Sequence, residues 1–240
     1  MSGLAARWRE LAGATVLLDG FHALKHALRF GAEVPLAVTA DKAGALRLAR
    51  ELAPDVTERL AASLREVTPA ELASLVARPH PTGIAALAAP APRRPAPGGP
   101  PVVLLDEPRH LGNVGAVIRL AAGAGAAGVL TTGTVDPWHP TVLRAAAGLH
   151  FATAVDRLAP GEPPPGPVYA FDAAGEDLRA VEIPPGTLLA FGSERFGLTP
   201  ELRERATRVL ALPMRPGVSS YNLATSVAMA LYHWLTRPSA

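Results

Sequence analysis

Short apolar runs alternate with amphipathic segments along the chain, and the runs have the length of strands. In the second half they lack polar alternation, so we expect them to be buried on both faces of a parallel sheet. The predicted strands there are 102–105, 128–132, 150–154, 168–171, 188–191 and 209–212. The predicted helices are 114–124, 140–147, 200–206 and 220–235. This alternation indicates an α/β fold whose ligand binds beyond the carboxyl ends of its strands.

The first half shows the same alternation on a smaller scale. The pattern predicts strands over 15–19, 35–39 and 83–89, and helices over 20–30 and 42–52. A further helix should begin at Thr68, because Thr68-Pro69-Ala70-Glu71 supplies an N-cap, a proline at the first helical position and the glutamate of a capping box. Residues 1–89 are therefore expected to form a small α/β domain.

Proline and glycine separate the two halves. The segment 88–101 reads AAPAPRRPAPGGPP and prevents helix or sheet continuity. We interpret 90–100 as a semi-rigid linker, and 101–240 as a second domain. Arg93 and Arg94 could contact RNA from the linker, or the linker could be solvated without a ligand.

Composition narrows the function classes without choosing one. The chain has no cysteine, which excludes disulfides, thiolate nucleophiles and cysteine-ligated metal. Its net charge is only +2, and the basic excess lies in the first 100 residues. This excess fits a phosphate partner, but an arginine-rich coding bias explains it equally well. We expect no membrane-spanning helix and no signal peptide, and therefore a cytoplasmic protein.

A first candidate site follows the strand predicted at 102–105. Asp106-Glu107-Pro108 leads to Gly112-Asn113-Val114-Gly115-Ala116, and Arg119 comes six residues after Asn113. If a helix starts there, Asn113 can cap it. Asn113 and Arg119 need not share a face of this helix, although both could reach one pocket. The alternative is a capped helix that carries a surface arginine.

Two further candidate sites follow later strands. In Gly192-Ser193-Glu194-Arg195-Phe196-Gly197, two glycines flank a carboxylate and a guanidinium, so the loop can present backbone groups to a flat ligand. It could also be a simple turn with an exposed ion pair. The third site runs from Leu212 through Pro213, Met214 and Gly217 to Ser219-Ser220-Tyr221-Asn222. Either serine can cap the last helix, and Asn222 in its first turn offers a donor and an acceptor.

Other chemistries find little support. The seven histidines do not show metal-ligand spacing, and we expect no metal site. No Gly-x-Ser-x-Gly elbow indicates a hydrolase. A dinucleotide oxidoreductase is disfavoured because Gly-x-Gly-x-x-Gly is missing after 102–105.

Together the three candidate sites resemble the signature motifs of the SpoU branch of the SPOUT methyltransferases. The matching elements are Asn113-x-Gly115-Ala116-x-x-Arg119, Gly192-x-Glu194-x-x-Gly197-Leu198, and Pro213-Met214 followed by Ser220-x-Asn222. Asp19-Gly20-Phe21-His22-Ala23 and Pro81-Thr82-Gly83-Ile84-Ala85 resemble segments of the substrate-binding domain that many members carry. Tyr221 departs from the family pattern, because leucine is common at its position.

The resemblance implies a parallel-sheet SPOUT catalytic domain with a C-terminal trefoil knot, preceded by a small N-terminal RNA-binding domain. It implies a homodimer that transfers a methyl group from S-adenosylmethionine (AdoMet) to a ribose 2′-hydroxyl of RNA. The reactive site would comprise Arg119, Asn113, Glu194, Ser220 and Asn222. The cofactor would be held at Gly192, Leu212, Met214, Gly217 and Tyr221.

The sequence leaves open which RNA is the substrate and whether the protein is an enzyme. The separate front domain favours ribosomal RNA over transfer RNA, and an enzyme that confers antibiotic resistance is possible. The main rival of another class is a non-catalytic RNA-binding or assembly protein on the same scaffold.

Overall fold

The computed structural model describes residues 3–162 and 165–236 and divides into two compact units. The first unit comprises residues 1–91 together with 146–152, and the second comprises 92–145 together with 153–240. The short segment 146–152, which the sequence pattern assigns to the second domain, thus groups with the first. Within the described ranges, no helix is long and apolar enough to cross a membrane.

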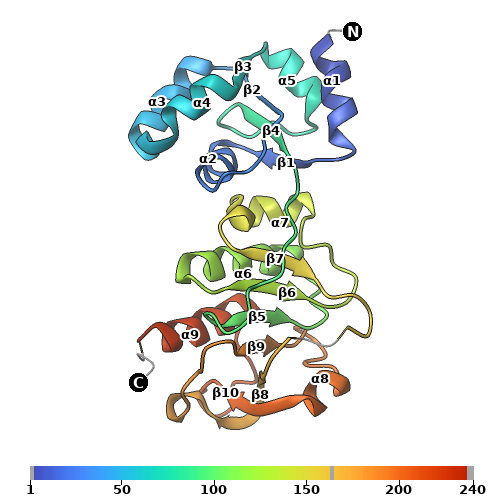
Figure 1. The fold of residues 1–240 in the computed structure, drawn as a ribbon, viewed down its shortest axis with the longest axis vertical. Coiled ribbons are helices and arrows are strands. Elements are labelled where there is room, and N and C mark those ends of the chain that lie inside the picture. The colour runs from blue at the N-terminus through green and yellow to red at the C-terminus, as the bar shows by residue number, and fades with distance from the viewer. Residues whose placement is uncertain (1–2, 163–164, 237–240) are drawn as a thin grey trace. The chain divides into compact units, whose positions relative to one another are not determined.

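The first unit is built on a four-stranded sheet in the order β1-β4-β2-β3 (Figure 1). Strand β4 runs antiparallel to both of its neighbours, whereas β2 and β3 are parallel. The strands are β1 Val16–Asp19, β2 Leu36–Thr39, β3 Leu64–Glu66 and β4 Ile84–Ala88. The helices are α1 Gly3–Ala12, α2 Phe21–Arg29, α3 Lys42–Leu52, α4 Thr57–Ser63 and α5 Pro69–Leu75, with a short 3-10 turn at Pro54–Val56.

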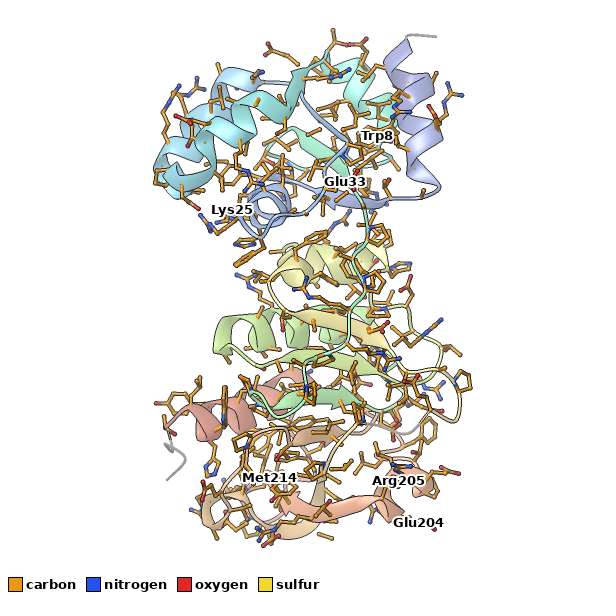
Figure 2. All side chains as sticks on the ribbon, in the orientation of Figure 1. Trp8, Lys25, Glu33, Glu204, Arg205 and Met214 are labelled. Carbon is orange, nitrogen blue, oxygen red and sulfur yellow. The ribbon has the colours of Figure 1, made fainter. Side chains whose placement is uncertain are left out.

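Local sequence signals explain where several of these elements begin. The capping box at the start of α5 is present as predicted, with reciprocal hydrogen bonds between Thr68 and Glu71. Asp41 caps α3 by accepting the backbone N–H of Gly44 at 2.7 Å. The pattern does not predict α1, because Trp8 is the only buried residue of that helix. Figure 2 shows Trp8 on α1, where it packs into the core with Leu36, Val38 and Leu87.

The second unit has a six-stranded, fully parallel sheet in the order β10-β8-β9-β5-β6-β7. The strands are β5 Val102–Leu105, β6 Gly128–Thr131, β7 Ala154–Arg157, β8 Val168–Asp177, β9 Leu188–Phe191 and β10 Ala206–Ala211. The helices are α6 Leu111–Ala124, α7 Pro140–Ala145, α8 Pro200–Glu204 and α9 Leu223–Thr236, with 3-10 turns at Leu149–Phe151 (in the first unit) and Leu178–Ala180. Helix α6 packs against α7 and α9.

The predicted parallel sheet is confirmed, and its central strands are buried along their whole length, as the apolar runs indicate. Two strand predictions need correction. The strand predicted over 150–154 is wrong, because a 3-10 turn at Leu149–Phe151 precedes β7 and its buried residues merge with the strand into one apolar run. Strand β8 extends past Phe171 to Asp177, because its exposed outer half still pairs with β10 after a register shift.

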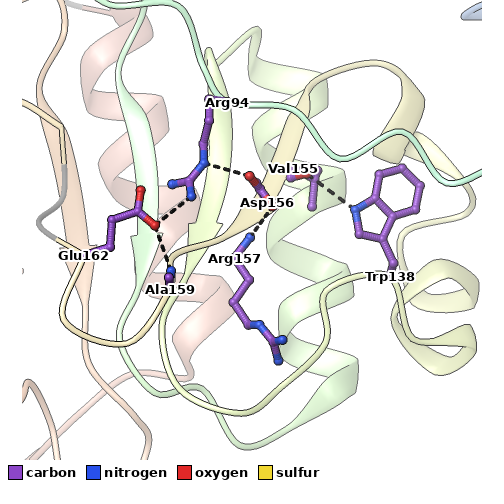
Figure 3. A network of polar contacts seen from close by, with 7 residues as sticks. All are labelled: Arg94, Trp138, Val155, Asp156, Arg157, Ala159 and Glu162. Carbon is purple, nitrogen blue, oxygen red and sulfur yellow. Dashed lines mark hydrogen bonds and ion pairs between the residues drawn. The ribbon is translucent and has the colours of Figure 1, made fainter.

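The proline-rich segment is attached to the second unit by both of its arginines, and Figure 3 shows the contacts of Arg94. Arg94 pairs with Asp156 at 2.7 Å and with Glu162 at 2.9 Å. Arg93 donates to the Thr153 carbonyl at 3.0 Å, and its backbone N–H donates to Val155. These contacts engage both side chains with the protein, while most of the segment 90–100 is exposed to solvent.

Glu162 is one of the two carboxylates that hold Arg94, and its own position is fixed by a backbone hydrogen bond. It accepts the Ala159 N–H at 2.8 Å as well as the Arg94 guanidinium. The backbone hydrogen bond from Ala159, followed by the one from Arg94, lowers the pKa of the Glu162 carboxyl. A lowered carboxyl pKa contributes stability above the unfolded-state pKa, and this contribution is lost as the pH falls through the folded-state value. The attachment is therefore fully formed at neutral pH.

Candidate active site

The first motif follows β5, where a buried carboxylate organises the turn. Asp106 is 3% exposed, and it accepts the Thr132 hydroxyl at 2.8 Å and the Thr199 N–H at 2.7 Å. These two bonds tie the end of β5 to the turn after β6 and to the cap of α8. Paired in this way, Asp106 is a structural group rather than a free acid or base.

Helix α6 begins at Leu111, so the prediction that Asn113 caps it is wrong. His110 occupies the cap position, and its carbonyl accepts the N–H groups of Asn113 and Val114. Asn113 is the third helical residue, and capping does not use its side chain. The carboxamide is therefore available to the neighbouring loops.

The second motif forms a tight loop after β9. Ser193 and Gly197 exchange backbone hydrogen bonds of 2.9 and 3.0 Å, and Gly197 adopts a φ of +69°. The closed loop presses against Gly192, where an added Cβ would lie 2.0 Å from the carbonyl carbon of Gly197. Only glycine fits at position 192, and this constraint exposes the backbone there.

The third motif connects β10 to α9. Asn222 caps α9, with its Oδ1 accepting the N–H groups of Ala224 at 2.9 Å and Thr225 at 3.4 Å. The predicted cap at Ser219 or Ser220 is wrong, because the helix starts at Leu223, three residues later than expected. The Tyr221 hydroxyl donates to the Pro213 carbonyl at 3.0 Å and so closes the connecting loop.

Hydrogen bonds through Asn113 join the three motifs. Its Nδ2 donates to Glu194 Oε1 at 2.6 Å, and its Oδ1 accepts from Asn222 Nδ2 at 3.3 Å. Since Asn222 Oδ1 is used by the helix cap, its amide nitrogen is the group left to donate. One carboxamide thus fixes the relative positions of a helix start and two loops.

These motifs surround a pocket of about 600 Å³ that lies beyond the carboxyl end of β9 and beside the middle of β8. The predicted residues that line it are Asn113, Gly192, Glu194, Leu212, Met214, Ser220, Tyr221 and Asn222. Figure 2 labels Met214, in the segment after β10. Gly217 lies in the same connection but does not line the pocket.

Part of the pocket wall was missed by the sequence motifs. Phe171 and Phe191 stack with ring centroids 4.4 Å apart and planes 9° apart, and both line the pocket beside Asp172. Both phenylalanines end predicted strands. The rule that ligands bind at the carboxyl ends of parallel strands could therefore have identified them from the sequence. His110 is a further lining residue outside the predicted set.

Arg119 does not reach this pocket. Its exposed side chain lines a separate groove of about 660 Å³ between α6 and α9. Apolar side chains dominate the groove, including Leu120, Met229, Tyr232 and Leu235. No hydrogen bond or ion pair links Arg119 to the described residues. The structure therefore brings four of the five predicted reactive residues together and leaves Arg119 on another face of α6.

The sheet order and the pocket define the class of the second unit as the fold of SPOUT methyltransferases. The crystal structure of the SpoU methyltransferase AviRb from Streptomyces viridochromogenes in complex with AdoMet matches with a TM-score of 0.78 at 21% identity. The match covers 98% of this chain and 97% of AviRb. The model of the SpoU rRNA Methylase family matches residues 100–232, more than half of the chain. The chain therefore belongs to the SpoU rRNA methylase family.

Curated relatives carry the same family signal. A 23S rRNA (uridine(2479)-2′-O)-methyltransferase of Streptomyces viridochromogenes is 30% identical over 148 residues, which is 54% of this chain and 50% of the relative. A tRNA (cytidine(34)-2′-O)-methyltransferase of a Polaromonas species is 34% identical over 146 residues, which is 54% of this chain and 86% of the relative. The chain spans about half the length of several curated relatives that it matches.

The Gly192 constraint generates a first prediction. Gly192→Ala forces a methyl group into the backbone of Gly197, so we expect the free energy of unfolding to fall by about 1–3 kcal/mol. Gly112→Ala is the matched control, because nothing lies within 4 Å of its Cβ position and it sits inside α6. Its stability should be unchanged or rise by up to about 1 kcal/mol. Urea unfolding of both variants measures the difference, and equal stabilities would contradict the close approach.

Proposed function

We propose that this chain transfers a methyl group from AdoMet to a ribose 2′-hydroxyl of RNA. The observation that carries the proposal is the pocket in which all three SpoU motifs converge through Asn113. Membership of the SpoU family supports the same activity.

The pocket suits AdoMet by size and by chemistry. Its volume of about 600 Å³ lies within the usual range of cofactor sites, and apolar and polar groups share its lining. Gly192, Leu212 and Tyr221 would hold the cofactor by their backbone, and Met214 would contact it; Gly217 would shape the loop. When bound, AdoMet supplies an electrophilic sulfonium methyl group. We further propose that the chain around this loop forms the trefoil knot implied by the family.

The protein's own contribution to the reaction is positioning. A ribose hydroxyl is a poor nucleophile until it begins to lose its proton, and transfer requires in-line attack on the methyl group. Glu194 holds the Asn113 amide in place, and Asn113 and Ser220 orient the ribose. A guanidinium is an unsuitable general base, so Arg119 donates hydrogen bonds to the hydroxyl oxygen and a neighbouring phosphate, and the hydroxyl proton leaves to water as the methyl group is transferred. No residue role in this scheme requires a metal.

Arg119 completes the site only from a second copy of the chain. Within one chain it faces the groove between α6 and α9, beside Met229, Tyr232 and Leu235, which are 39%, 68% and 53% exposed. Exposed apolar side chains lining one groove favour a protein interface. We therefore propose a homodimer through this groove, in which Arg119 of each copy serves the pocket of the other.

Ribosomal RNA is the favoured substrate, and transfer RNA is the second candidate. The likeness to a solved rRNA methyltransferase from Sinorhizobium meliloti covers 97% of this chain, whereas the likeness to a solved enzyme for 2′-OH methylation of tRNA covers 57%. A first unit with its own sheet and core can serve as an additional RNA-binding domain for a large folded target. The tRNA alternative rests on a relative of which this chain covers 86%.

Methyl transfer tests the activity directly. Labelled AdoMet is incubated with the protein and with separate ribosomal and transfer RNA fractions from cells that lack it. We expect label in ribosomal RNA, in dinucleotides that resist alkaline cleavage because the 2′-oxygen is methylated. Label in transfer RNA alone would shift the substrate to the second candidate. Absence of both AdoMet binding and transfer would favour the non-catalytic scaffold.

Complementation between variants tests the role of Arg119. Arg119→Ala and Asn113→Ala should each be inactive as homodimers. After mixing and subunit exchange, the mixed dimer keeps one intact pocket, so activity should recover to about a quarter of the wild-type value. As an unmixed homodimer, Arg119→Lys should have little activity, because lysine lacks the bidentate geometry. If the mixture stays inactive although mass spectrometry detects mixed dimers, Arg119 does not act across the interface.

A further inference from the structure

An aromatic ring projects into solvent at the tip of the loop beside the pocket. Phe196 is 75% exposed, more than any other large apolar side chain among the described residues. A single exposed phenylalanine is ordinary on a protein surface. What distinguishes Phe196 is its position, two residues after Glu194 in a loop whose other members line the pocket.

The loop holds this ring on a rigid base. Ser193 and Gly197 close the loop with two backbone hydrogen bonds, and the Phe196 N–H points to Ser193 Oγ at 3.4 Å. The close approach of the Gly197 backbone to Gly192 restrains the loop further. Little backbone entropy remains to be lost when a ligand contacts Phe196, so the ring is preorganised for binding.

The Phe196 ring lies close to a cationic side chain. The Arg109 guanidinium lies 5.6 Å from the Phe196 ring centroid, in the range of a cation–π contact. Arg109 also pairs with Glu107 at 3.7 Å, but side-chain exposures of 58% and 50% make this pair weak. Arg195, which precedes Phe196 in the sequence, is exposed and forms no ion pair with the described residues. One arginine thus lies against the ring, while the carboxylates of Glu107 and Glu194 are engaged.

We propose that Phe196 and Arg109 form the contact site for the nucleotide that is methylated. The base of an unpaired nucleotide stacks on the open surface of the Phe196 ring, and Arg109 binds an adjoining phosphate. Because the ribose lies between base and phosphate, these two contacts place it at the mouth of the pocket, beside Glu194 and Asn113. Stacking on aromatic side chains and arginine contacts to phosphate are the usual means of holding single-stranded RNA. This inference rests on the proposed methyltransferase function.

Kinetics with ribosomal RNA distinguish stacking from simple apolar contact. Phe196→Ala should raise the KM for RNA about tenfold or more and leave the dissociation constant of AdoMet unchanged. Phe196→Leu is the matched control, because leucine is apolar but has no aromatic face, and it should show the same defect. Phe196→Trp should retain the wild-type KM. A Phe196→Leu enzyme with the wild-type KM would overturn the proposal.

A binding measurement keeps the inference separate from the activity. Phe196→Trp places an exposed indole at the tip of the loop, whereas the native Trp8 and Trp138 are buried and Trp234 is half-buried. With the wild-type signal subtracted, a single-stranded oligoadenylate should quench this fluorescence, and an abasic oligonucleotide of equal length should not. Arg109→Gln should weaken binding of both and reduce the slope of log Kd against log salt by about one.

The two measurements separate the possible failures. Quenching by oligoadenylate without any methyl transfer would uphold the stacking site and refute the proposed function. Methyl transfer with equal quenching by both oligonucleotides, or with no quenching, would uphold the function and refute the stacking site.

Discussion

The candidate site depends on the hydrogen bonds of one carboxamide. Asn113 joins the start of α6 to Glu194 in the loop after β9 and to Asn222 at the start of α9. These three segments are far apart in the sequence, and each alone is only a loop or a helix end. Other features of the second unit hold these segments close together. The parallel sheet places the carboxyl ends of its strands at one edge, and Gly192 lets the loop after β9 close tightly. The cap of α9 orients the Asn222 amide that donates to Asn113.

Sequence patterns predicted the parts whose physics is local or fully buried. The central strands were recognisable because both faces are apolar, and the capping box at Thr68 because its signature spans four residues. Features that depend on distant partners were not recognisable. The outer half of β8 is polar and is held by β10, and the start of α6 at Leu111 moves Asn113 from the predicted cap into the helix. The motif residues converge largely as expected, and the position of Arg119 in a groove away from them matches the alternative of a surface arginine that the six-residue offset from Asn113 left open.

The separation of Arg119 from the pocket is the reason why we propose that two chains build each reactive site. One chain carries the pocket and an exposed arginine on different faces of α6, so under the proposed mechanism a complete reactive site would require two chains. On the same chain, the loop that closes over Gly192 also carries Phe196, whose ring contacts Arg109 from the segment before α6. Cofactor binding and substrate placement would then share a single structural element. Mutations in the loop should affect either process according to whether they alter its backbone or its exposed tip.

The central claim is that Asn113 couples the three motifs to form the cofactor pocket. A double-mutant cycle for AdoMet affinity, measured by titration calorimetry, combines Glu194→Ala with Asn222→Ser, which keeps a helix-cap oxygen but does not reach Asn113. Among the described residues these two side chains are linked only through Asn113. We predict a coupling energy of about 0.5–3 kcal/mol that disappears when Asn113 is replaced by alanine. Losses that add within about 0.3–0.5 kcal/mol, in the presence of Asn113, would contradict the account.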